Sequence, residues 1–381
     1  MPMPAGGRHR PLPDVETLTD LDEALASGRP LTGLRLQDLD LTAYEDALLA
    51  RTDVQGLVVL GGRLPDALDA HLRAHRALIF PTDPSAPIDP YRGTLYQPEE
   101  LYAGLAEHGY QATPDALAYH WSLDAASRHD AFVTLLRAIH DDSITDALTE
   151  FTGSRGVVGV MGGHVLARGS DSYAAAARLG HTVARTGLVV ATGGGPGAME
   201  AANLGAFAAD PTALDEAVAR LSAVRTFRPD VGAWAALALE VRGSLAAERG
   251  EDSVTSLGIP TWFYGHEPPN VFCDGIGKYF SNAIREDGLL ARATCGIVVL
   301  EGAAGTVQEI FQALTPLFYA PEGARLAPLV LVGQEYWTDS VPVWPAIRAL
   351  AQGRALEPAL HLVDSVEEAA AIVIDGAGRP G

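Results

Sequence analysis

Two glycine-rich turns, each lying between an apolar run and a helix-forming segment, are the chemically most informative features of this 381-residue chain. The first follows the apolar residues 187–191, and the second follows the apolar residues 296–300. Glycine lets a backbone approach a ligand closely, and a helix that begins at such a turn directs unpaired N–H groups and its positive dipole end towards it. Each turn therefore predicts an anion site, most often for phosphate. The residues concerned are Gly193, Gly194, Gly195 and Gly197 in the first turn and Gly302, Gly305 and Thr306 in the second.

The second glycine turn is followed by an acidic residue that points to chemistry as well as binding. Both turns follow strands of one predicted parallel sheet, so they can face each other across a crevice at the carboxyl ends of those strands. We expect Glu309 on the first turn of the helix after the second glycine turn, where it would look into that crevice. A glutamate at a helix start is also favoured by the helix dipole alone. The prediction of a functional role for Glu309 therefore rests on the glycine motif beside it.

At these residues the chain resembles the LOG family, enzymes that remove the base from nucleoside 5′-monophosphates and are often mislabelled lysine decarboxylases. Residues 193–203, GGGPGAMEAAN, are nearly the first motif of the bacterial members, and residues 302–309, GAAGTVQE, are a variant of the second, PGGxGTxxE. The segment EPPN at 267–270, the residues 162–164 and the long N-terminal extension are most similar to the long bacterial nucleotide 5′-monophosphate nucleosidases. The resemblance covers about residues 153–375 and leaves the N-terminal part unexplained.

The resemblance implies hydrolysis of the N-glycosidic bond of nucleoside 5′-monophosphates to free base and ribose 5-phosphate. Such a cleavage passes through a ribosyl-cation-like state, which a carboxylate near the anomeric carbon can stabilise while it activates the attacking water. Glu309 is the candidate for this catalytic role. Arg285, on the helix before the second motif, is the candidate arginine, with Arg292 as its substitute. The family likeness adds Gly162, Gly163 and His164 to the phosphate- or nucleotide-binding residues, and it implies no cofactor and no metal.

The second motif departs from the family pattern at two positions. Glu301 stands where the family has proline, and Ala303 stands where it has glycine. A carboxylate beside a phosphate site repels the ligand unless it turns away or meets a cation. The alternative function is therefore a nucleotide-binding carrier or regulatory protein that has lost hydrolysis.

Two other enzyme classes are disfavoured by the sequence. A pyridoxal-phosphate decarboxylase needs a Schiff-base lysine, and Lys278 is the only lysine in the chain. An NAD-dependent dehydrogenase needs an acidic residue at the end of the next strand, and the long stretch that follows Asn203 breaks that spacing.

Composition and charge limit the partners. The formal net charge of −21, from 27 basic and 48 acidic residues, argues against a nucleic-acid surface or an anionic membrane. Cys273 and Cys295 are the only cysteines, which gives neither a disulfide framework nor a zinc site. Because no signal peptide or membrane span is evident, we expect a cytoplasmic protein whose partner is a small-molecule nucleotide. The family likeness implies a homodimer or a higher homo-oligomer.

Strands alternate with helices along most of the chain, which predicts an α/β protein with a doubly wound, Rossmann-like parallel sheet and a smaller N-terminal α/β domain. Residues 1–12 are expected to form a disordered tail. Residues 13–150 are expected to form the N-terminal domain with its helical connection, including strands at 56–60 and 77–80. Residues 151–381 are expected to form the catalytic domain. Its strands are expected at 157–161, 188–191, 259–264, 297–300 and 327–332, with a two-helix insertion at about 210–256.

Overall fold

The computed structural model describes residues 14–80, 82–124, 130–250, 253–263, 267–321 and 323–378. The chain divides into two compact units, one ending at Gly93 and the other beginning at Thr94. The expected tail at residues 1–12 lies outside the described residues. None of the helices in the described part is long and apolar enough to cross a membrane.

The first unit is built around a parallel sheet, whose described strands have the order β1-β2-β3-β4. The predicted strands at 56–60 and 77–80 are confirmed as β3 and β4. The helices bury leucines against the sheet, and Leu21, Leu48 and Leu68 are completely inaccessible to solvent. The elements are β1 (Asp14–Val15), α1 (Leu18–Ala26), β2 (Arg35–Gln37), η1 (Thr42–Tyr44), α2 (Glu45–Leu49), β3 (Val58–Leu60), α3 (Asp66–Ala74) and β4 (Leu78–Phe80).

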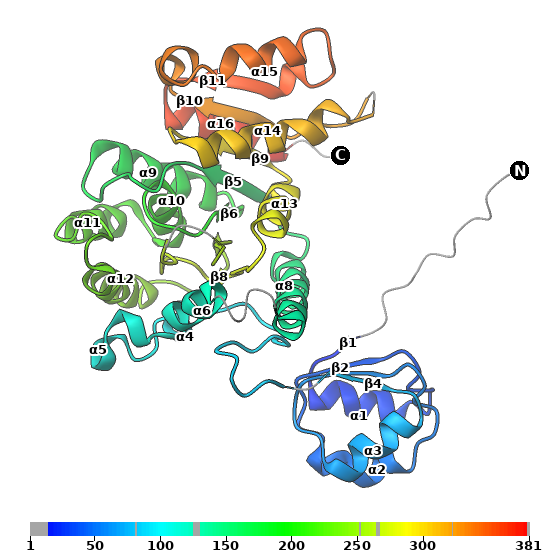
Figure 1. Cartoon of the computed structure of the whole chain (residues 1–381). Helices are drawn as coiled ribbons and strands as arrows, with labels where there is room; N and C mark the ends of the chain where they lie inside the picture. The colour runs from blue at the N-terminus through cyan, green and yellow to red at the C-terminus, as the bar shows by residue number, and fades with distance from the viewer. Residues whose placement is uncertain are drawn as a thin grey trace, which may run out of the picture. The chain divides into compact units, whose positions relative to one another are not determined.

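The second unit is built around a larger parallel sheet, whose described strands have the order β11-β10-β9-β5-β6-β7-β8 (Figure 1). The central strands are continuous apolar runs buried on both faces, as expected of a parallel sheet covered by helices on each side. The strands are β5 (Val157–Met161), β6 (Val189–Thr192), β7 (Ser256–Gly258), β8 (Gly275–Ile276), β9 (Gly296–Val299), β10 (Leu329–Val332) and β11 (Leu360–Val363).

The order of these strands creates a topological switch point between β5 and β9. From β5 the chain winds outward through β6 to β8, and from β9 it winds in the opposite direction through β10 to β11. Right-handed crossovers therefore place α9 and α10 on one face of the sheet and α14 and α15 on the other. Loops diverge at such a point, which is where open α/β sheets bind ligands. The predicted doubly wound, Rossmann-like fold is confirmed.

The helices of the second unit fall before, within and after this sheet. Helices α4 to α8 precede β5, and α11 and α12 lie within residues 210–256, where a two-helix insertion is predicted. The helical elements are α4 (Pro98–Leu101), α5 (Leu105–His108), η2 (Tyr110–Ala112), α6 (Pro114–Leu123), α8 (Ala131–Thr152), α9 (Asp171–Ala184), α10 (Ala198–Phe207), α11 (Pro211–Leu221), α12 (Val231–Ala246), α13 (Asn282–Arg292), α14 (Ala304–Phe318), the π-helix η3 (Tyr336–Ser340), α15 (Trp344–Ala351), η4 (Glu357–Ala359) and α16 (Val366–Gly378).

The structure corrects the sequence-based assignment at the edges of this sheet. The strand expected at 259–264 lies earlier, as β7, and Tyr264 is outside the described residues. Residues 275 and 276 form the further short strand β8, and the next helix, α13, begins at Asn282. A two-residue or three-residue strand has too short an alternation to be recognised by its pattern.

The boundary between the units also differs from the expected one near residue 150. Helix α6 carries Asp115, whose carboxylate accepts hydrogen bonds from the ammonium of Lys278 at 2.5 Å and from the indole N–H of Trp262 at 2.9 Å. Helix α8 carries Asp141, which accepts the backbone N–H of Phe280 at 2.9 Å. These contacts join residues 139 to 163 positions apart, and they tie α6 and α8 to the second sheet. Local sequence patterns carry no signal for such pairings.

Replacing Asp115 by alanine is expected to lower the free energy of unfolding by about 3–5 kcal/mol, because the buried ammonium of Lys278 then loses its counter-charge. All five tryptophans belong to the second unit, so tryptophan fluorescence during urea unfolding reports on this unit alone. Glu107→Ala, at an exposed position on α5, is the matched control. A loss of stability no larger than that of the control would contradict the structural role of the Asp115–Lys278 pair.

Candidate functional site

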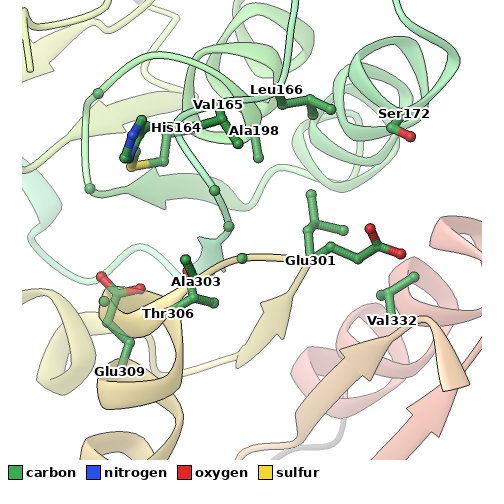
Figure 2. A pocket seen from close by; sticks show the side chains of 18 of the residues that line it. His164, Val165, Leu166, Ser172, Ala198, Glu301, Ala303, Thr306, Glu309 and Val332 are labelled. Carbon is green, nitrogen blue, oxygen red and sulfur yellow. The ribbon is translucent and has the colours of Figure 1, made fainter. Parts of the chain in front are cut away.

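A cavity of about 970 Å³ opens at the switch point, along the carboxyl ends of β5, β6, β9 and β10 (Figure 2). Figure 2 shows His164 and Glu309 at one end of this cavity and Glu301, Ser172 and Val332 at the other. Most of the residues expected to form the site lie in its wall. They are Gly162, Gly163, His164, Gly193, Gly195, Arg285, Gly302, Gly305, Thr306 and Glu309.

The first glycine turn is held in shape by buried polar side chains behind it. The hydroxyl of Thr192 donates to Oδ1 of Asn203 at 2.6 Å and accepts the backbone N–H of Gly194 at 2.9 Å. Asn270 donates to the carbonyl of Gly195 at 3.2 Å and to the same Oδ1 of Asn203 at 3.0 Å. The motif asparagine, Asn203, is completely buried and therefore organises the turn without meeting a ligand.

Gly194 and Gly197 have structural reasons to be glycine, and neither lines the cavity. Gly194 has a φ of +70°, and a Cβ there would lie 2.6 Å from Cδ of Pro260. Gly197 has a φ of +74°, and a Cβ there would lie 2.5 Å from the carbonyl oxygen of Gly163. Gly194 therefore lets the loop after β6 pack on the segment after β7, and Gly197 lets it pack on the loop after β5.

Both helices that begin at the glycine turns lack a side-chain cap. Helix α10 follows Gly197 and helix α14 follows Ala303, and neither N-cap residue accepts a side-chain hydrogen bond from its helix. By contrast, α9 is capped by the hydroxyl of Ser170 and α13 by that of Ser281. The first N–H groups of α10 and α14 thus have no competing side-chain acceptor, which is the arrangement of an anion-binding helix terminus.

Glu309 and Arg285 form a pair inside the cavity. Nη1 of Arg285 lies 3.4 Å from Oε1 of Glu309, whose side chain is 13% exposed. Burial, helped by the charges of Glu286 and Glu267 and opposed by Arg285, raises the pKa of Glu309 to about 7. Glu309 can therefore exchange a proton near neutral pH, as a catalytic acid or base must.

Arg285 retains a hydrogen-bond donor that the described residues do not use. Its Nη2 donates to Oδ1 of Asn282 at 2.9 Å and lies 3.7 Å from Oε1 of Glu286. Its Nε is buried and, among the described residues, has no hydrogen-bond partner. An unsatisfied buried donor is costly, so this atom is suited to meet an acceptor on a ligand. Arg292, the substitute arginine, instead donates to the carbonyl of Thr145 at 2.9 Å and lies outside the cavity lining.

His164 lies in the loop after β5 and is paired with a residue of the EPPN segment. Its Nδ1 lies 2.9 Å from Oε1 of Glu267, and both side chains are partly exposed in the cavity. The hydrogen bond to Glu267 raises the pKa of His164 above its ordinary value. The sequence marked His164 as a binding residue but did not indicate its partner, because the two are joined only by the fold.

The second glycine turn accommodates its departures from the family motif. A Cβ on Gly302 would collide with the side chain of Thr306 at 2.1 Å, so glycine is required there. Ala303 is exposed and creates no such conflict. Glu301 is exposed at the far end of the cavity, and Figure 2 shows it on the opposite side from Glu309. Its carboxylate thus lies beside the turn and away from the Glu309–Arg285 pair.

Carboxylates are prominent in the cavity wall. Besides Glu309 they are Glu267, Glu286, Glu301, Asp364 and Glu367. Arg285 and Arg178 are the lining arginines within the described residues, and Arg178 lies 3.9 Å from Glu367. An anionic ligand is therefore best bound by Arg285 together with the backbone N–H groups of α10 and α14. Glu286 was not singled out from the sequence, since a single acidic residue on an amphipathic helix resembles ordinary surface charge.

The fold is that of a Rossmann-like α/β protein, with a cavity at the switch point where such sheets bind ligands. A model of the SLOG cluster4 family, LDcluster4, matches residues 155–214, from β5 through the first glycine turn into α11. The match covers well under half of the chain and supports a relationship of this segment to the SLOG, LOG-like superfamily. No curated protein gives a significant match.

Several solved structures are similar to part of the chain. The molybdenum cofactor binding protein from the phototrophic bacterium Rippkaea orientalis has 16% identity and a TM-score of 0.34, over 58% of this chain and 98% of that one. The molybdenum cofactor carrier protein from Chlamydomonas reinhardtii has 16% identity and a TM-score of 0.36, over 59% and 99%. The protein TM1055 has 19% identity and a TM-score of 0.33, over 58% and 99%.

The raised pKa of Glu309 predicts how the stability of the second unit depends on pH. Between pH 4.5 and about 7 the folded state keeps the proton that the unfolded state loses, so the free energy of unfolding falls as pH rises through this window. A shift of this size corresponds to about 3 kcal/mol. Glu309→Gln removes this dependence, so the stability of the variant relative to the parent should increase from pH 5 to pH 8. Urea unfolding followed by tryptophan fluorescence measures it, and parallel pH profiles for the two proteins would contradict the assigned pKa.

Proposed function

We propose that this protein hydrolyses the N-glycosidic bond of nucleoside 5′-monophosphates and yields a free base and ribose 5-phosphate. The observation that carries the proposal is the pairing of Glu309 with Arg285 inside a cavity bordered by two helices without side-chain caps. The carboxylate of Glu309 suits the sugar and its developing positive charge. Arg285 and the N-termini of the two helices suit the phosphate. The resemblance of both glycine motifs to those of the LOG family supports the same reaction.

In the proposed reaction Glu309 acts on the anomeric carbon. As the bond to the base breaks, positive charge develops on the ribose ring, and a nearby carboxylate stabilises that charge. The ionised Glu309 also accepts a proton from the water that attacks the anomeric carbon. With a pKa of about 7, Glu309 is partly ionised at neutral pH and is a stronger base than an ordinary glutamate.

In the proposed complex the phosphate is bound by donors rather than by a concentration of positive side chains. Gly193, Gly195, Gly302 and Gly305 expose backbone at the two turns, and Thr306 contributes a hydroxyl near the start of α14. Arg285 supplies the unsatisfied Nε. Gly162, Gly163 and His164 close the wall on the side of β5. Neither a metal nor a cofactor is required for this chemistry.

A second candidate function is a nucleotide-binding carrier or regulatory protein that has lost hydrolysis. The observation in its favour is Glu301, a carboxylate beside the second turn where the family motif has proline. Figure 2 shows Glu301 and Glu309 on opposite sides of the cavity, which favours the enzyme, since Glu301 leaves the contact of Glu309 with Arg285 intact. We further propose that the protein is cytoplasmic and assembles as a homodimer or a higher homo-oligomer, as the LOG likeness implies.

Glu309→Gln is expected to lower the rate of base release by about 100-fold or more, because the amide neither accepts the proton of water nor stabilises the ribosyl cation. Nucleotide affinity, measured by calorimetry, should stay within a few-fold of the parent. Glu216→Gln, at an exposed position on α11, is the matched control and should retain parental turnover. Turnover by Glu309→Gln equal to that of the parent would remove the assigned role.

Arg285→Ala is expected to raise the Michaelis constant for the nucleotide by about tenfold and to slow turnover, because a charge-assisted contact to the ligand is lost. Steady-state kinetics of base release measures both constants. Arg292→Ala, on the same helix but outside the cavity lining, should leave the Michaelis constant unchanged. If Arg285→Ala keeps parental constants and Arg292→Ala does not, the ligand-binding arginine is Arg292.

A further inference from the structure

We propose that His164 is the general acid that protonates the departing base, with Glu267 as the residue that positions and charges it. The inference rests on the proposed nucleosidase function and adds a second catalytic pair to it. It assigns to His164 a role in bond cleavage that is distinct from holding phosphate. It also explains why a half-exposed histidine and a half-exposed glutamate are paired at the wall of this cavity.

The two pairs lie at opposite ends of the first glycine turn. A Cβ on Gly193 would lie 3.5 Å from Nη1 of Arg285, which places the Arg285–Glu309 pair at the start of the turn. A Cβ on Gly195 would lie 3.1 Å from Oε2 of Glu267, which places the His164–Glu267 pair at its end. Figure 2 shows His164 and Glu309 at the same end of the cavity, on elements that face each other.

The spacing between the pairs suits a reacting ribose. Two residues of extended chain span at most about 7 Å, so Gly193 and Gly195 are separated by no more than that. A ribose ring lying along the turn would present its anomeric carbon to Glu309 and the attached base to His164. Glu267 is also close enough for its charge to raise the pKa of Glu309, which agrees with this arrangement.

The hydrogen bond between His164 and Glu267 determines which nitrogen of His164 can transfer a proton to the base. Since Nδ1 of His164 donates to Oε1 of Glu267, Nε2 is the ring nitrogen that can meet a ligand. The carboxylate favours the imidazolium form and raises its pKa, so more of the acid is protonated at neutral pH. The ring of Phe227 also packs edge-on near the imidazole of His164, with ring centroids 6.4 Å apart.

The proposed step balances in atoms and electrons. The N-glycosidic bond breaks with its electron pair going to the base nitrogen, and Nε2–H of His164 transfers its proton to the base. Water adds to the anomeric carbon and gives one proton to Glu309. Transfer of that proton to solvent, and protonation of His164 from solvent, restores both residues. The net reaction consumes one water and releases base and ribose 5-phosphate.

A substrate whose leaving group needs no proton distinguishes a general acid from a residue that only binds the ligand. We compare kcat/KM of the parent and of His164→Gln on the best natural nucleoside 5′-monophosphate and on 4-nitrophenyl ribofuranoside 5-phosphate, which releases 4-nitrophenolate without protonation. For His164→Gln we expect a loss of about 100-fold on the nucleotide and little change on the nitrophenyl substrate. Glu267→Gln should show the same split with a smaller loss. His108→Gln, at an exposed position on α5, is the matched control.

Each outcome of this comparison bears on one of the two proposals. Equal losses on both substrates would show that His164 binds or orients the ligand, and would overturn its role as acid while leaving the nucleosidase function intact. Parental rates on both substrates would overturn it as well. Absence of cleavage of both substrates by the parent itself would remove the nucleosidase function, and the general acid with it.

Discussion

The alignment of β5 between β6 and β9 is the constraint on which the rest of the site depends. In this parallel register Val160 of β5 pairs with Thr192 of β6 and with Val298 of β9. The three strands therefore end together, and the loops that follow them open at one edge of the sheet. Because the chain winds in opposite directions on either side of β5 and β9, the helices after these loops lie on opposite faces and leave a cavity between their N-termini.

Burial then determines the electrostatics of that cavity. Carboxylates are prominent in its wall, so it does not attract an anion through side-chain charge alone. Desolvation and the neighbouring acidic residues raise the pKa of Glu309, and Arg285 limits the rise to about 7. Glu309 is therefore partly ionised at neutral pH. The same arginine keeps one buried donor for a ligand. A site with these properties suits proton transfer beside a bound phosphate better than tight capture of a highly charged molecule.

The sequence predicted most of the features that depend on local patterns. The apolar runs of β5, β6, β9 and β10 and the glycines that follow them identified the sheet and the edge at which the cavity opens. Glu309 and Arg285 were predicted from a motif and a register, and the structure places their side chains 3.4 Å apart. The contacts that the sequence could not supply are long-range. The pairing of Lys278 with Asp115 moves α6 into the second unit, and the pairing of His164 with Glu267 joins two loops more than 100 positions apart in the chain. No periodicity or propensity encodes such pairs.

The most direct test of the central claim is to incubate the purified protein with the 5′-monophosphates of adenosine, guanosine, cytidine and uridine and to separate the products by chromatography. The account predicts equimolar free base and ribose 5-phosphate from at least one of them. Release of inorganic phosphate with an intact nucleoside would contradict it. Recovery of every nucleotide unchanged, with binding still measurable by calorimetry, would contradict it too and would favour a carrier or regulatory protein.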